Sequence, residues 1–374
     1  MAQTRLAYLD NLRFLVIILV ITMHSAVTYS GFGSWYYVEG APEKLNVFEM
    51  VIFGFLQSFL QAWFMGILFF ISAFFAAKSL SKYGSLKFFK ERLFRLGLPL
   101  LIYMLFIDPS ISYFILGQQS DNPIWHDYIN YLLSLDWLSS SGPLWFALAL
   151  LIFCTFYIVI RKFIPKQKTI SVIQTKNIIV VIALTGIAAF LIRLVFPIGS
   201  AVLNLQFSYF ASYITLFVFG IMAGENDLLD SISERENIKW MILSLVIGIP
   251  LWGIIMVFGG TLEGNFNFNG GFNWQSFAFA LWESFTAIGF SIGLTAFFRE
   301  KLNSGNAFSG LLTENAFGMY FFHAPILIAV SLLLKNWAAG ALIKFITVMI
   351  LAAIGSFAFS LAIRKIKPAG ILLK

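Results

Sequence analysis

Residues 8–29 read YLDNLRFLVIILVITMHSAVTY, an apolar stretch long enough to cross a bilayer that still carries charged and titratable side chains. Asp10 and Arg13 lie at its start, and His24 lies well inside it. Ionisable residues inside a membrane span usually face a cavity or another helix, so we interpret Arg13 and His24 first as functional residues. Arg13 and His24 are about three helical turns apart, which predicts both side chains on nearly the same face, roughly 16 Å apart along the axis. The alternative is an arginine that reaches the interface and a histidine that only bonds a neighbouring helix.

The whole chain has the composition of a membrane protein. Of its 374 residues, 59% are hydrophobic and 11% are charged, and the mean hydropathy is +0.85. These values exclude an ordinary soluble domain. The net charge of +7 is better explained by cytoplasmic loops than by nucleic-acid binding. With Cys154 as the single cysteine, an intramolecular disulfide or a thiolate metal site is excluded.

Apolar runs predict an all-α polytopic membrane protein with about ten spans, forming one membrane-embedded domain over residues 1–374. The expected spans are 12–29, 48–77, 93–116, 144–163, 178–196, 202–223, 240–258, 277–298, 315–334 and 338–363. Orientation follows from the basic residues, because Lys and Arg stay on the cytoplasmic side. Of the 25 Lys and Arg residues, 21 fall in segments 1–13, 78–95, 161–176, 224–239, 299–313 and 364–374. Both termini should therefore be cytoplasmic, and the connections 117–143 and 259–275, which have no Lys or Arg, should face outward.

A cluster of cations precedes the third span in the sequence KYGSLKFFKERLFRLGLP, residues 82–99. Arg92 and Arg95 are three residues apart, so an α-helix would place them on one side. Such a pair at a cytoplasmic mouth either touches anionic headgroups, as part of the topology signal, or binds the phosphates of a cytosolic donor. The combination with a mid-depth histidine on the first span favours the donor.

The ninth span carries a second intramembrane histidine in the sequence ENAFGMYFFHAPILIAV, residues 314–330. For His323 the structural interpretation is favoured, as an imidazole that packs between helices and bonds to Tyr320 one turn earlier. Pro325 should loosen the helix and free a backbone carbonyl. Glu283 on the eighth span needs a cationic partner or a proton, and the sequence leaves Arg193 and an imidazole as alternatives.

Four motifs, taken in order, give the chain a family resemblance. They are LDNLR followed by His24, FFISAFFAA ahead of RLFR and LGLP, GPLWFALALLIF around Trp145, and MYFFHAPIL around His323. Together they resemble the membrane acyltransferase family 3 over essentially the whole chain. The closest likeness is to the branch of the glucan biosynthesis protein C group, which is proposed to succinylate periplasmic glucans. Some family members carry a further extracytoplasmic hydrolase-like domain, which we do not expect here.

The resemblance implies transfer of an acyl group from cytosolic acyl-CoA to a hydroxyl of an extracytoplasmic glycan or similar acceptor. It implies an enzyme of cell-envelope polysaccharide modification in the cytoplasmic membrane of a bacterium. The functional residues of the family map to His24 and Arg13 as catalytic residues, and to Arg92 and Arg95 as the residues that hold the donor. Acyl-CoA would be the donor substrate, and no metal or prosthetic group is predicted, because two lone histidines do not supply a ligand set.

Two other classes of protein stay open from the sequence. Polar residues near the membrane midplane on several helices are also typical of a transporter or exporter of a polar metabolite, although no inverted repeat is visible. A structural component of an envelope complex is the weakest alternative, because it leaves Arg13, His24 and the RxxR pair without a role.

Overall fold

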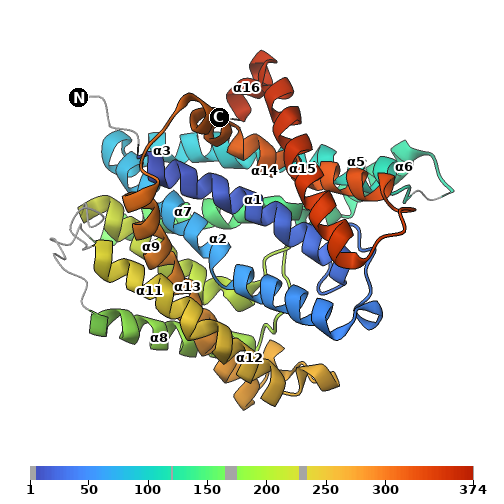
Figure 1. The fold of residues 1–374 in the computed structure, drawn as a ribbon. Coiled ribbons are helices and arrows are strands. Elements are labelled where there is room, and N and C mark those ends of the chain that lie inside the picture. Colours follow the sequence, from blue (N-terminus) through green and yellow to red (C-terminus); the bar gives the residue numbers. More distant parts are fainter. Residues whose placement is uncertain (1–5, 119–120, 165–174, 227–233, 374) are drawn as a thin grey trace. The chain divides into compact units, whose positions relative to one another are not determined.

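The computed structural model of the protein describes residues 6–118, 121–164, 175–226 and 234–373 (Figure 1). Among these residues every named element is a helix, and the strand-like pairing is one isolated bridge between Val202 and Leu205. The prediction of an all-α fold is confirmed. Residues 1–5 and parts of the connections 161–176 and 224–239, which contributed to the predicted orientation, lie outside the described residues.

Ten helical stretches are long and apolar enough to cross a membrane, and each overlaps one of the ten predicted spans. Most spans are single helices that continue past the apolar run, as α2 does to Tyr83. The third span, Ser85–Ile115, joins several helical pieces, and the seventh, Asn237–Phe258, joins most of α11 to α12. The α-helices are α1 Ala7–Ser30, α2 Val47–Tyr83, α3 Ser85–Arg92, α4 Leu98–Ile102, α5 Asp108–Ser110, α6 Ile124–Leu133, α7 Trp145–Phe163, α8 Thr175–Arg193, α9 Phe210–Asn226, α11 Glu234–Val246, α12 Gly248–Phe258, α13 Trp274–Lys301, α14 Ala307–Leu333, α15 Ala341–Arg364 and α16 Lys367–Leu372.

The third span alternates between α-helical pieces and wider π-helical turns. The π turns are Leu93–Gly97, Tyr103–Ile107 and Ile111–Ile115. Pro99 and Pro109 lie near the start of the α pieces between them. Because proline has no amide hydrogen, each one leaves a carbonyl of the preceding turn without its helical donor, which favours such irregular turns.

The chain divides into two compact units, each assembled from three separate segments. The first comprises Met1–Arg13, Phe59–Lys90 and Ile152–Gly305, and the second comprises Phe14–Ser58, Glu91–Leu151 and Asn306–Lys374. Since α1, α2 and α7 each begin in one unit and end in the other, neither unit is a separate stretch of chain.

Two pairs of glycines let helices of the first unit approach closely. On α13, a Cβ atom added at Gly293 would lie 2.3 Å from the amide nitrogen of Met241 on α11. On α9, a Cβ at Gly220 would lie 2.2 Å from the carbonyl oxygen of Phe70 on α2. Gly289 and Gly224 repeat these contacts one turn away. Small residues four apart are typical of helix contacts in membranes, where apolar side chains gain little from burial against each other.

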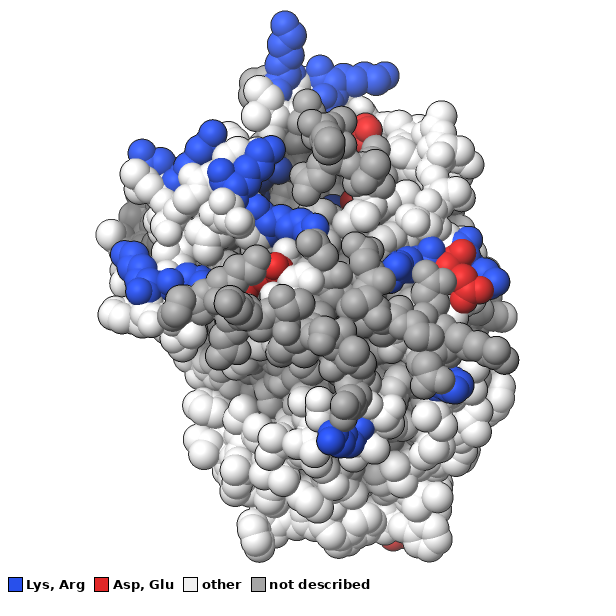
Figure 2. All heavy atoms as spheres, turned by 90° about the vertical axis from the view of Figure 1, so that its left-hand side faces the viewer, with Lys and Arg blue, Asp and Glu red and all other residues white. Residues whose placement is uncertain are grey.

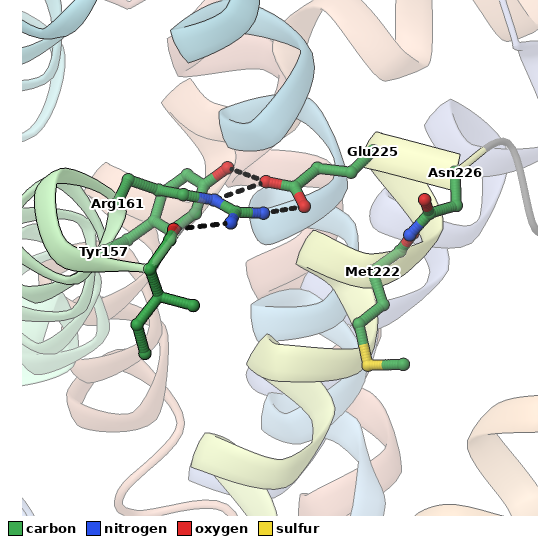
Figure 3. A network of polar contacts seen from close by, with 6 residues as sticks. Tyr157, Arg161, Met222, Glu225 and Asn226 are labelled. Carbon is green, nitrogen blue, oxygen red and sulfur yellow. Dashed lines mark hydrogen bonds and ion pairs between the residues drawn. The ribbon is translucent and has the colours of Figure 1, made fainter. Parts of the chain in front are cut away.

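Two ion pairs join helices of the first unit. At one, Arg161 of α7 donates from Nε to Oε1 of Glu225 on α9 at 2.8 Å, and the Tyr157 hydroxyl donates to the same oxygen at 2.6 Å (Figure 3). At the other, Arg193 of α8 pairs with Glu283 of α13, and both side chains are buried. The Arg193 guanidinium also lies 5.6 Å from the ring centres of both Tyr209 and Phe279. Glu283 thus takes Arg193, one of the two partners that the sequence left open.

In the second unit α14 packs closely on α15, because Gly318 leaves room for Ser360. The hydroxyl of Ser360 donates to Oδ1 of Asn315 at 2.9 Å. The second half of α1 joins this pair, since the Ser25 hydroxyl donates to the carbonyl oxygen of Phe345 at 3.0 Å. The half of α1 that carries His24 is therefore held by hydrogen bonds to the C-terminal helices.

Candidate active site

His24 lies less than two turns before the end of α1. Its side chain is partly exposed, whereas those of Ser25 and Ala26 beside it are fully buried. The helix ends at Ser30 because Gly31 adopts a left-handed conformation, with φ of +71°, and its amide donates to the carbonyl of Val27. His24 is therefore less buried than the two residues that follow it on α1.

The chain after α1 folds back and places an indole ring on His24. The ring centres of His24 and Trp35 are 4.3 Å apart, and their planes differ by 12°. Trp35 is held by its own Nε1, which donates to the Thr28 hydroxyl at 3.0 Å and to the Tyr37 carbonyl at 2.9 Å. The return is tight, because a Cβ at Gly40 would lie 2.0 Å from the Tyr29 carbonyl oxygen. Only glycine fits at that position.

His323 of α14 lies beside the same imidazole. The ring centres of His24 and His323 are 5.2 Å apart, with 23° between the planes. His323 is fully buried, and its Nδ1 lies 2.7 Å from the carbonyl oxygen of Tyr320. A carbonyl only accepts, so Nδ1 carries a proton, and in the neutral ring Nε2 carries the lone pair. The expected bond to Tyr320 is present, but to its backbone; its hydroxyl instead donates to the Pro143 carbonyl.

The three rings form a triangle rather than a column. The ring centres of Trp35 and His323 are 6.4 Å apart, well below the sum of their distances to His24. If His24 were sandwiched between them, that distance would be close to the sum. Trp35 and His323 therefore do not lie on opposite faces of His24, and the side of the imidazole opposite Trp35 is not covered by His323.

Tyr36, the residue after Trp35, bonds to a buried carboxylate of the third span. The Tyr36 hydroxyl donates to Oδ1 of Asp108 on the third span and lies 3.4 Å from the Tyr103 hydroxyl. Burial raises the pKa of Tyr36 well above its ordinary value, and the neighbouring Tyr103 and Asp108 raise that pKa further. Tyr36 therefore keeps its proton and remains a donor. The rings of Trp35 and Tyr36 meet edge to face, with centres 5.7 Å apart, so the polar pair adjoins the aromatic group around His24.

Two tyrosines of helix α6 donate hydrogen bonds to backbone carbonyls in the irregular part of the third span. Pro109 cannot donate to the carbonyl of Leu105, and the Tyr128 hydroxyl of α6 donates to that oxygen at 3.0 Å. One turn later on α6, the Tyr131 hydroxyl donates to the Met104 carbonyl at 2.6 Å. Burial raises the pKa of Tyr131 to about 12, so it remains a donor at neutral pH. The connection 117–143 is thus bonded to the segment that carries Asp108.

The remaining predicted site residues lie at the ends of their helices. Arg13 is near the start of α1, where its Nη1 is 3.5 Å from Oδ1 of Asp10 and its guanidinium carbon is 5.4 Å from the Phe75 ring centre. Arg92 ends α3 and is partly buried, and Arg95 is exposed within the π turn. The α-helical spacing assumed for this pair is therefore wrong, because the wider turn begins between the two residues.

Among the charged side chains on one face of the molecule, basic ones outnumber acidic ones (Figure 2). Lys87 and Lys90 on α3 are exposed just ahead of the RxxR pair. Among the described residues, no three His, Cys, Asp or Glu side chains lie close enough together to hold a metal ion.

The comparison with known families covers almost the whole chain. A family model described as an acyltransferase domain, that of acyltransferase family 3, matches residues 6–365. The chain belongs to acyltransferase family 3. No curated protein and no solved structure matches it. The protein is therefore a multi-pass membrane acyltransferase, and the resemblance seen in its motifs is confirmed at the level of the family. Its place in the glucan biosynthesis protein C branch stays a prediction.

In this acyltransferase, the surroundings of His24 were only partly visible from the sequence. His24 and His323 were both predicted at mid-depth, but nothing indicated that their rings would be neighbours. Trp35 was missed, because it lies in a short connection without periodicity. The available signal was composition: three consecutive aromatic residues, Trp35 to Tyr37, follow two glycines directly after the span that carries the histidine, in the sequence GFGSWYY.

Proposed function

We propose that the protein transfers an acyl group from cytosolic acyl-CoA to a hydroxyl of an extracytoplasmic glycan or similar acceptor. The observation that carries the proposal is the partly exposed imidazole of His24, inside a membrane-spanning helix and beside Trp35, in a chain of acyltransferase family 3. A nitrogen base inside a membrane-spanning helix, which both substrates can reach, is what a reaction between a donor from one side and an acceptor from the other requires.

The reaction follows from general base chemistry. A nitrogen of His24 takes the proton of the acceptor hydroxyl as its oxygen attacks the thioester carbonyl. When the carbon–sulfur bond breaks, the CoA thiolate takes that proton back from the imidazolium, which leaves an ester and free CoA. In the covalent alternative, the imidazole attacks the thioester carbonyl, and the CoA thiolate leaves with the proton of the ring N–H. The acceptor hydroxyl then takes the acyl group, and its proton restores the neutral imidazole. Both routes need the same accessible nitrogen.

The donor would bind through the RxxR pair. Arg92 and Arg95 lie where the third span begins, and guanidinium groups suit phosphate oxygens because of their fixed fork of donors. The pantetheine arm would extend from these cations toward His24 in the same unit. Arg13, at the start of the helix that carries His24, would steady the donor or the environment of the imidazole.

The proposal is tested with purified protein in liposomes, labelled acyl-CoA species and candidate glycans. We expect label on a glycan with the parent protein and not with His24→Ala. Label that crosses the membrane without a new covalent product would identify a transporter instead. If neither transfer nor transport occurs with any donor, acyl-CoA is not the substrate. Acid-quenched label on the protein itself would favour the covalent route.

A further inference from the structure

The groups around His24 lack the carboxylate that usually supports a histidine base. Among the described residues no carboxylate bonds to the His24 ring, and the buried Asp108 is engaged by Tyr36. When His24 takes a proton it must nevertheless carry a positive charge in a region of low polarity, where an unsupported charge is costly. Its two ring neighbours are therefore the groups available to stabilise that charge.

His323 is fixed in the form that suits this task. Its Nδ1 hydrogen is committed to the Tyr320 carbonyl, so the ring cannot turn without losing that bond. In the neutral ring Nε2 is then an acceptor, and it is buried without a hydrogen-bond partner in the described part of the chain. A buried acceptor left unpaired in the resting state interacts much better with a charged N–H donor than with a neutral ring.

Trp35 offers the second contact. Its indole lies against a face of the imidazole and is anchored by both bonds of its Nε1, so the ring pair is prearranged. Indole attracts a cation over its face more strongly than it attracts a neutral ring, and the attraction grows when water is excluded. The contact should therefore strengthen when His24 becomes charged.

We propose that Trp35 and His323 are positioning residues that stabilise the imidazolium of His24 during acyl transfer, His323 as a hydrogen-bond acceptor and Trp35 through its ring face. This inference rests on the proposed function, because it assumes that His24 is protonated within the catalytic cycle. Neither residue needs to touch the substrate. Stabilisation of a charge that exists only during the reaction raises kcat and leaves the binding of the donor unchanged.

The test uses pairs of variants that differ in one property. His323→Gln and His323→Met have similar size, but only glutamine offers an acceptor and a donor for the Tyr320 carbonyl. We expect His323→Met to lower kcat about ten- to hundredfold with an unchanged KM for acyl-CoA, which is the range of a hydrogen bond to a charged group. His323→Gln should stay within a few-fold of the parent. Trp35→Phe and Trp35→Leu both lose the Nε1 bonds, and only Leu loses the ring face, so Leu should be the slower variant.

The outcomes separate this inference from the proposed function. An inactive parent protein overturns the proposed function itself. An active parent with His323→Met at full kcat overturns only the role of His323, and equal kcat for Trp35→Phe and Trp35→Leu overturns that of Trp35. A variant that raises KM and leaves kcat unchanged would also overturn the inference, because such a change means that the residue binds the substrate in the ground state. His126→Met, a variant of the third histidine on α6, is the matched control and should behave as the parent.

Discussion

Arg193 and Glu283 form an ion pair inside the first unit, with exposed side-chain fractions of 0% and 3%. Removing one partner leaves a buried charge, which costs about 3–5 kcal/mol, whereas replacing both by apolar residues is often neutral. We therefore expect Glu283→Ala to lower the midpoint of thermal unfolding in detergent clearly, and Arg193→Met with Glu283→Leu to recover most of it. As a control, Glu314→Gln removes the partly exposed pair with Arg364 and should change little. A double variant as unstable as the single one would contradict this account.

His24→Ala should nearly abolish turnover. Loss of a general base typically lowers the rate by about two to four orders of magnitude, and the RxxR pair should still bind the donor. Single-turnover transfer and the Kd for CoA, measured on the same folded preparation, check both statements. A His24→Ala protein that acylates near the parent rate would exclude this histidine as the base or nucleophile.

Replacing Arg92 and Arg95 together by Gln should weaken CoA binding and reduce its dependence on salt, because the variant has lost two phosphate contacts. The Kd at low and high ionic strength is the measurement. Lys301→Gln, at an exposed cation in another basic segment, should leave both values unchanged. Unaltered CoA affinity in the double variant would mean that the pair serves only the membrane topology.

The orientation of the chain is tested with single cysteines in a background without Cys154. Asn122, Asn267 and Ser85 are exposed, so each position accepts a label without disturbing the core. Because Lys and Arg concentrate in the predicted inner connections, cysteines at Asn122 and Asn267 should react with an impermeant thiol reagent from outside, and one at Ser85 should not. The reverse pattern would refute the assignment of both termini to the cytoplasm.

The sequence predicts the spans well, because hydrocarbon imposes a length and a composition that are readable locally. The same physics explains what it leaves open. Apolar side chains do not specify which helices adjoin, so the contact between His24 and His323, or the choice of Arg193 for Glu283, depends on packing between distant segments. The motifs identified the family, but they did not indicate the π turn that begins between Arg92 and Arg95.

The bond from Tyr128 to the carbonyl of Leu105 has a consequence for how this enzyme tolerates change. Connections between membrane helices usually accept insertions and deletions, because their backbone makes few bonds to the helices. Here the Tyr128 hydroxyl, in the connection 117–143, replaces the amide donor that the membrane helix lacks at Pro109. Insertions that displace Tyr128 should therefore disturb the backbone at Leu105, three residues before Asp108.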